Sequence, residues 1–132
     1  MKITPDTNLL VRLLVNDDER QNRLAREELE RAELIVLALP TLCELAWVLS
    51  RGYRVSSRGV TDAMIGLLES KNVVTNRPAV EAGIALLEAG GDFADGAIAH
   101  EGRSLGADEF VSFDKKAVRL LASRGEAARL LG

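Results

Sequence analysis

The stretch Leu34-Ile35-Val36-Leu37-Ala38-Leu39 is an uninterrupted apolar run with the length of a single β-strand. A continuous run, without alternating polar residues, is typical of a strand that is covered on both faces of a parallel sheet. Pro40-Thr41 follows directly and suits the first turn of a helix that we expect to reach Leu49. This step from strand to helix predicts an α/β fold.

Strands and helices alternate on both sides of this run. Before it we expect a short strand over 2–5, a helix that includes 9–14, and a charged helix that a turn at 16–18 starts and that ends near 32. After it we expect helices over 57–69, 78–89, 92–105 and 115–123, strands over 72–75 and 110–113, and a last edge strand over 128–131. Such alternation implies a parallel sheet of four or five strands with helices on both faces.

Length and composition limit the classes of protein that remain possible. The chain has 132 residues, and we take residues 1–132 as a single domain because no repeat or flexible linker is visible. A hydrophobic fraction of 47% and a charged fraction of 28% exclude a disordered chain. The formal net charge of −3 excludes a strongly cationic protein that binds nucleic acid through its net field alone.

Cysteine content and hydropathy give the expected compartment. Cys43 is the only cysteine, so no internal disulfide and no zinc-finger spacing are possible. No signal peptide is recognisable at the start, and no apolar run approaches the roughly 20 residues of a membrane span. We therefore expect a cytoplasmic protein that does not interact with membranes.

Five acidic residues lie where a parallel sheet would bring functional groups together. Asp6 and Asp114 follow expected strands, Glu44 lies within an expected helix, and Asp92 and Asp95 lie at the start of another. Taken singly, Asp6, Asp92 and Asp114 are well explained as helix N-caps, and Asp95 as an acid favoured by the helix dipole. Glu44 lies among apolar residues, which indicates a buried or cleft-facing acid.

Taken together, the acids predict a cation site. Residues that follow parallel strands converge at one edge of the sheet, and carboxylates packed together repel each other unless a cation is present. Oxygen ligands suit Mg²⁺ or Mn²⁺, which can activate water for phosphodiester cleavage.

Four motifs, in this order and spacing, resemble those of the PIN-domain family and within it the VapC-type toxins of bacterial toxin–antitoxin pairs. They cover nearly the whole chain and are Asp6-Thr7-Asn8, Pro40-Thr41-Leu42-Cys43-Glu44-Leu45-Ala46-Trp47-Val48-Leu49, Asp92-Phe93-Ala94-Asp95-Gly96-Ala97-Ile98-Ala99 and Val111-Ser112-Phe113-Asp114. The resemblance implies a three-layer α/β/α sandwich and a Mg²⁺- or Mn²⁺-dependent ribonuclease that hydrolyses RNA with an activated water.

The resemblance also implies roles for individual residues. The catalytic and metal-binding acids would be Asp6, Glu44, Asp95 and Asp114. The residues that orient ligands or water would be Thr7 or Asn8, and Ser112. Asp92 fits either an additional acid outside the ligands or a helix cap, and we favour the cap.

Two residues depart from the family pattern. Pro5 lacks an N–H group, so Thr4-Pro5 predicts a first strand that is short or bent at its end. Gly96 stands where small or larger apolar residues are common in the family and is expected to weaken its helix slightly. Neither departure removes a carboxylate.

Several other residues and helices each allow two interpretations. Arg51 and Arg54, together with Arg58, and Lys115 with Lys116, either guide RNA phosphates or lie on solvated surfaces. Trp47 is expected in the core, with the wall of a groove for an antitoxin helix as the alternative. The helices near 9–15 and 57–69 are candidates for that groove or for homodimer contacts. The resemblance implies both a protein antitoxin and a homodimer.

Three functions compete at this point. A ribonuclease toxin is the leading hypothesis, and a non-catalytic PIN-like module that binds RNA or protein is the second. A metal-dependent phosphatase or receiver-like domain is third, because that class would place paired acids after the first strand and only Asp6 is found there.

Overall fold

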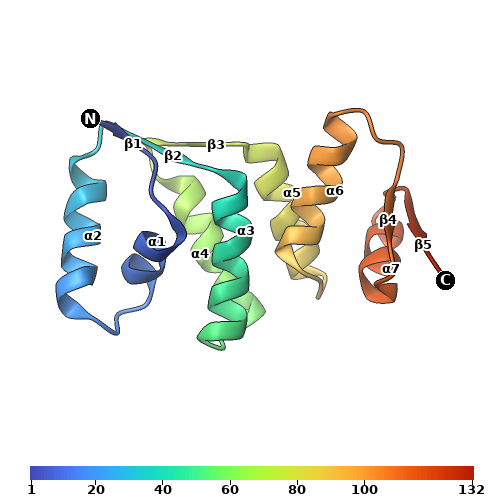
Figure 1. Cartoon of the computed structure of the whole chain (residues 1–132), viewed down its shortest axis with the longest axis horizontal. Helices are drawn as coiled ribbons and strands as arrows, with labels where there is room; N and C mark the ends of the chain where they lie inside the picture. Colours follow the sequence, from blue (N-terminus) through green and yellow to red (C-terminus); the bar gives the residue numbers. More distant parts are fainter. The chain divides into compact units, whose positions relative to one another are not determined.

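The computed structural model describes every residue from Met1 to Gly132 and divides into two compact units, Met1–Arg77 and Pro78–Gly132. Figure 1 shows the helices and strands of both units in chain order. All strand pairs are parallel, with three strands joined in one sheet and two in another. The predicted α/β class and its alternation of strands and helices are therefore confirmed.

The first unit holds the three-stranded sheet, in the order β1-β2-β3. Its strands are β1 (Lys2–Ile3), β2 (Leu34–Leu37) and β3 (Val73–Thr75). Its helices are α1 (Thr7–Leu14), α2 (Glu19–Arg31), α3 (Leu39–Trp47), the π-helical turn η1 (Val48–Gly52) and α4 (Ser57–Glu69). In the register, Ile35 of β2 lies between Ile3 of β1 and Val73 of β3.

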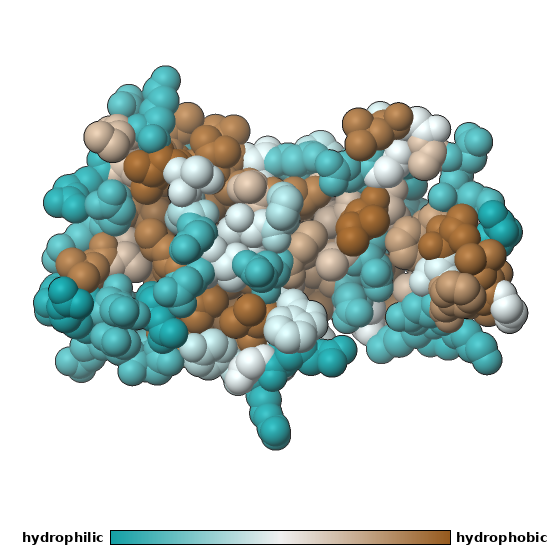
Figure 2. Space-filling model, viewed as in Figure 1, coloured by the Kyte–Doolittle hydropathy of each residue, from teal (hydrophilic) through white to brown (hydrophobic).

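Local hydrogen bonds account for where these helices begin. Asp18 caps α2 by accepting a hydrogen bond from the Gln21 backbone N–H, and Ser56 caps α4 in the same way through Gly59. Helix α2 buries little besides Ala25, and the side of the molecule where it lies is largely hydrophilic in Figure 2. The charged helix expected for this segment is confirmed, although Leu24 is 46% exposed.

The strand over 34–39 is shorter and less covered than its sequence suggests. Ile35 and Leu37 are buried, whereas Val36 on the opposite face remains 39% exposed. Strand β1 stops at Ile3, before Thr4-Pro5, as expected from the missing proline N–H.

Trp47 is 62% exposed, so its expected place in the core is wrong. Leu42, Leu45 and Leu49 form the buried side of α3 and η1, and that side fixes the orientation of the helix. Trp47 is three residues from Glu44 and shares its outward side.

The second unit holds α5 (Arg77–Glu88), which starts at the unit boundary, α6 (Phe93–Ser104), β4 (Phe110–Ser112), α7 (Lys115–Ser123) and β5 (Ala128–Leu130). The last edge strand is confirmed, because β5 pairs parallel with β4. Leu86, Ala99 and Leu121 form a buried cluster between α5, α6 and α7.

Gly96 is required by close packing of α5 and α6. A Cβ atom at Gly96 would lie 2.5 Å from the Ala82 carbonyl oxygen and 3.0 Å from Gly83 Cα. Gly83 is equally crowded, since its Cβ would lie 2.7 Å from the Phe93 ring. Gly96 therefore lets the start of α6, which carries Asp95, approach α5 closely. The close packing of the two helices comes together with the expected loss of helix propensity at this position.

Candidate functional site

The first unit contains a pocket of about 330 Å³ between α1 and the α3–η1 segment. Side chains from α1 and its N-cap, from α3 and η1, and from the segment after η1 line it: Asp6, Thr7, Asn8, Val11, Arg12, Glu44, Val48 and Tyr53. Three residues predicted for the site on the first motif and Glu44 of the second thus meet in one cavity.

Asp6 is placed by the turn from β1 into α1. It occupies the N-cap of α1, where its Oδ1 accepts a hydrogen bond of 2.9 Å from the Leu9 backbone N–H. The side chain is exposed, and its second oxygen accepts no hydrogen bond from the chain. The cap explanation and a role in the pocket are therefore compatible, because they use different oxygens.

Glu44 lies on α3 and points into the same pocket. Of the two expectations for this acid, the cleft-facing one holds, since Glu44 is exposed and lines the cavity. The Thr7 hydroxyl donates a hydrogen bond to Glu44 Oε1. Thr7 therefore orients one carboxylate oxygen and leaves the other available for a ligand.

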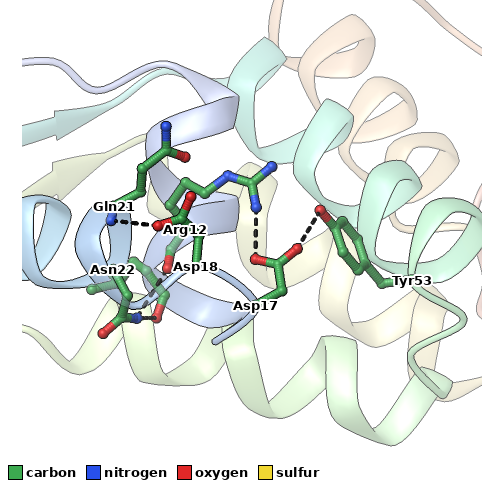
Figure 3. A network of polar contacts seen from close by, with 7 residues as sticks. Arg12, Asp17, Asp18, Gln21, Asn22 and Tyr53 are labelled. Atoms are coloured by element: carbon green, nitrogen blue, oxygen red, sulfur yellow. Dashed lines mark hydrogen bonds and ion pairs between the residues drawn. The ribbon is translucent and has the colours of Figure 1, made fainter.

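Arg12 and Tyr53 of this pocket belong to an ion-paired network with Asp17, which the sequence did not indicate; Figure 3 shows the network. Arg12 Nη1 lies 2.6 Å from Asp17 Oδ1, and the Tyr53 hydroxyl donates to Asp17 Oδ2 at 3.4 Å. The hydrogen bond from Arg12 lowers the pKa of Asp17, and the same bond raises the pKa of Arg12. Both groups therefore stay ionised across the physiological range.

Arg12 retains unused hydrogen-bonding capacity. Its Nε is buried and has no partner, which is uncommon for a buried donor, and only its Nη1 bonds to Asp17. A sequence signal for Arg12 existed, since it lies four residues after Asn8 on the same face of α1. Tyr53 is 36 residues from Asp17, and no local pattern connects the two.

The second unit places three acids near one another. Asp95 is half-buried in the first turn of α6, and its pKa is raised by burial and then by the negative charges of Asp92 and Asp114. Like-charged carboxylates that are near enough to raise a pKa favour a bound cation. Within this unit, Asp92 and Asp114 thus lie near enough to Asp95 to act on its charge, and the convergence of Asp6, Glu44, Asp95 and Asp114 stays a prediction.

The two flanking acids differ in how the chain holds them. Asp114 caps α7 by accepting from the Ala117 N–H at 3.0 Å, and its own N–H donates to Ser112 Oγ at 2.9 Å. Ser112 thus fixes the backbone of Asp114. Asp92 occupies the N-cap position of α6, but its side chain makes no capping hydrogen bond. The cap function favoured for Asp92 is wrong, and its carboxylate is exposed beside Asp95.

The basic residues considered for RNA contact are all exposed. Arg51 lies in η1 and Arg54 follows it with a positive φ of 55°. Lys115 and Lys116 form the first turn of α7, directly after Asp114. None of the four takes part in an ion pair, whereas Arg58 pairs with Asp62.

The donor chemistry of the pocket suits a hard divalent cation, because its acidic side chains offer oxygen ligands. In neither unit do three or more His, Cys, Asp or Glu side chains form a group that could hold a metal ion. Mg²⁺ keeps several waters and commonly takes only one or two protein carboxylates. The Asp6 and Glu44 pair, each with one free oxygen in one pocket, fits that requirement.

Comparison with known proteins assigns the family. The PIN-domain profile matches residues 3–121, and the chain therefore belongs to the PIN-domain family. This confirms the PIN-like α/β fold expected from the motifs. No curated protein sequence matches the chain.

A solved structure is similar to this chain over most of the length of both proteins. It is VapC20 of Mycobacterium tuberculosis, described as a sarcin–ricin loop cleaving toxin, with 19% sequence identity and a TM-score of 0.45. The match covers 82% of this chain and 86% of that protein.

None of the helices of the present chain is long and apolar enough to cross a membrane.

Proposed function

We propose that the protein is a Mg²⁺- or Mn²⁺-dependent endoribonuclease. The observation that carries this proposal is the pocket in which Asp6 and Glu44 each offer a free carboxylate oxygen. Asp95 and Asp114 complete the set of acids that the family resemblance implies. Their placement at the start of α6 and directly after β4 supports this assignment, as does the raised pKa of Asp95.

The residues of the chain act mainly by holding and orienting. Asp6 and Glu44 would bind the cation, with Thr7 fixing the rotamer of Glu44 through its hydroxyl. Ser112 keeps the backbone of Asp114 in place through the Asp114 N–H. When bound, the divalent cation lowers the pKa of water and stabilises negative charge on the phosphate. Acids at these positions therefore suit hydrolysis without a covalent enzyme intermediate.

RNA cleavage tests the proposal directly. Total cellular RNA is incubated with the purified chain in Mg²⁺ or Mn²⁺ and in EDTA, beside the Asp6→Asn and Asp18→Asn variants. Both aspartates cap a helix through one carboxylate oxygen, and asparagine caps about equally well. The two variants are therefore matched in stability, and only Asp6→Asn removes a pocket carboxylate.

We expect discrete, metal-dependent fragments from the wild type and from Asp18→Asn, and none from Asp6→Asn. Equal cleavage by Asp6→Asn contradicts the proposed site. Absence of cleavage with both ions, together with absence of metal binding in calorimetry, favours the alternative of a non-catalytic PIN-like module that binds RNA or protein.

We further propose that the protein is the toxin of a toxin–antitoxin pair and acts in the cytoplasm as a homodimer. The resemblance of the four motifs to VapC-type toxins supports this role, and the exposed Trp47 beside Glu44 offers an apolar contact for a partner. Expression of the wild type should arrest growth of a bacterial host, and Asp6→Asn should not. Rescue by a co-expressed protein from a neighbouring short reading frame would identify the antitoxin, and light scattering of the purified chain would test the dimer.

A further inference from the structure

Arg12 is the only cation that lines the pocket of Asp6 and Glu44. We propose that Arg12 binds a phosphate of the RNA strand beside the phosphate that is cleaved, and that Asp17 and Tyr53 hold its guanidinium in place. This inference rests on the proposed nuclease function and adds to it a residue that positions the substrate.

The helices place Arg12 on the pocket side of the molecule. Asn8 and Arg12 are four residues apart on α1, and Glu44 and Val48 are four apart on the facing α3–η1 segment. Residues at this spacing share one face of a helix. Arg12 therefore extends the row that begins with Asn8 at the carboxylate end of the cavity.

The charges of the pocket call for such a cation. Asp6 and Glu44 contribute two negative charges, and a phosphodiester strand brings one more with each nucleotide. A divalent cation held by these carboxylates would offset part of this repulsion at one phosphate. A fixed guanidinium beside them would neutralise a neighbouring phosphate and set the register of the strand.

The network around Arg12 leaves it available for a ligand. Asp17 takes a hydrogen bond from one terminal nitrogen of Arg12 and one from the Tyr53 hydroxyl (Figure 3). The second terminal nitrogen, Nη2, makes no hydrogen bond to Asp17, the side chain is 23% exposed, and Tyr53 also lies near enough to the guanidinium to raise its pKa. Because Asp17 already restricts the side chain, binding a phosphate costs less conformational entropy than it would with a free arginine.

A purely structural explanation has to be separated from this one. Arg12 also connects α1 to the turn before α2 through Asp17, and its backbone carbonyl accepts a hydrogen bond from Asn22 Nδ2 of α2 itself. If that connection is its only role, replacing Arg12 lowers stability without changing how RNA binding depends on salt. The salt dependence counts phosphate contacts and is therefore the decisive measurement.

The experiment measures binding of a short, labelled, mixed-sequence single-stranded RNA by fluorescence anisotropy over a range of salt concentrations. The full chain carries Asp95→Asn so that RNA is not consumed, and Mg²⁺ is present. In this background we compare Arg12→Gln, Arg12→Lys and Arg23→Gln. Arg23 is exposed on α2 and outside the pocket, so Arg23→Gln is a control for the loss of one positive charge. Circular dichroism establishes that each variant is folded.

We expect Arg12→Gln to weaken RNA binding about tenfold or more, as for loss of one charge-assisted hydrogen bond. It should also reduce the slope of log K against log salt by about 0.7, the value for one phosphate contact on a single strand. Arg12→Lys should restore the slope, and Arg23→Gln should leave it unchanged.

An unchanged slope in Arg12→Gln overturns the inference, and if the wild type still cleaves RNA the proposed nuclease stands. A reduced slope in a protein that cleaves no RNA supports the inference and contradicts the nuclease instead. Absence of RNA binding at every salt concentration overturns both.

Discussion

Replacing Gly96 by alanine should loosen the packing of α5 against α6. The added Cβ would lie 2.5 Å from the Ala82 carbonyl oxygen, 2.9 Å from Leu86 Cβ and 3.0 Å from Gly83 Cα. Two of these three contacts are with backbone atoms, so no side chain can rotate to relieve them and the helices must separate. Overpacking of this kind costs about 1–3 kcal/mol, against a gain of about 1 kcal/mol from the higher helix propensity of alanine.

Gly66 provides the matched control for this substitution. It lies inside α4, and a Cβ there would meet nothing within 4 Å. Gly66→Ala should therefore show the propensity gain alone and stabilise the protein by about 0.5–1 kcal/mol. The difference between the two variants isolates the contact, and we expect Gly96→Ala to be less stable than Gly66→Ala by about 1–3 kcal/mol.

Urea unfolding followed by circular dichroism measures this difference, and RNA cleavage gives a second readout. Because Gly96 directly follows Asp95, separation of the helices should also displace that carboxylate and lower the cleavage rate. Gly66→Ala should retain it. Equal stabilities of the two variants would refute the close approach of α5 and α6 and the explanation given for Gly96.

Two further substitutions, together with one surface control, test the acid site and the core of the second unit. Asp95 has a raised pKa, so the folded chain binds its proton more tightly than the unfolded chain, and stability is lost as pH rises from the ordinary value of 3.8 through the raised one. In urea unfolding, Asp95→Asn should therefore stabilise the metal-free protein at neutral pH and much less below about pH 3.8. The same substitution should abolish RNA cleavage. A gain in stability that does not depend on pH would contradict the raised pKa of Asp95. Leu121 is 2% exposed, so Leu121→Ala should cost about 2–5 kcal/mol in the same assay. Leu105 is 82% exposed, so Leu105→Ala should lower the free energy of unfolding by no more than about 0.5 kcal/mol.

The helices, the strands and the residues at which helices begin could be predicted from the sequence, because they depend on interactions between neighbouring residues. The caps at Asp18, Ser56 and Asp114 each join a side chain to the backbone three residues later. Apolar spacing along a segment likewise reports which side will be buried, as Leu42, Leu45 and Leu49 do. Asp92 is the exception, since its position predicts a cap and its side chain makes none.

The acids of the candidate site could also be predicted from the sequence, because functional groups in a parallel α/β protein gather at strand ends and helix starts. What the sequence left open for Glu44 was whether it is buried or faces a cleft. The contact with Thr7, 37 residues earlier, decides this in favour of the cleft. The proposed roles of the acids in catalysis remain for the cleavage experiment.

The sequence by itself determined the α/β class, the order of the elements and the candidate carboxylates, since each follows from local hydrogen bonds, spacing and motif. Only the tertiary structure decided that Trp47 is exposed, that Gly96 serves a close helix contact, and that Arg12 is held by Asp17 and Tyr53 beside the pocket. These features depend on which side of one element faces another. That choice is made by the summed burial of the whole unit, which no short segment of sequence contains.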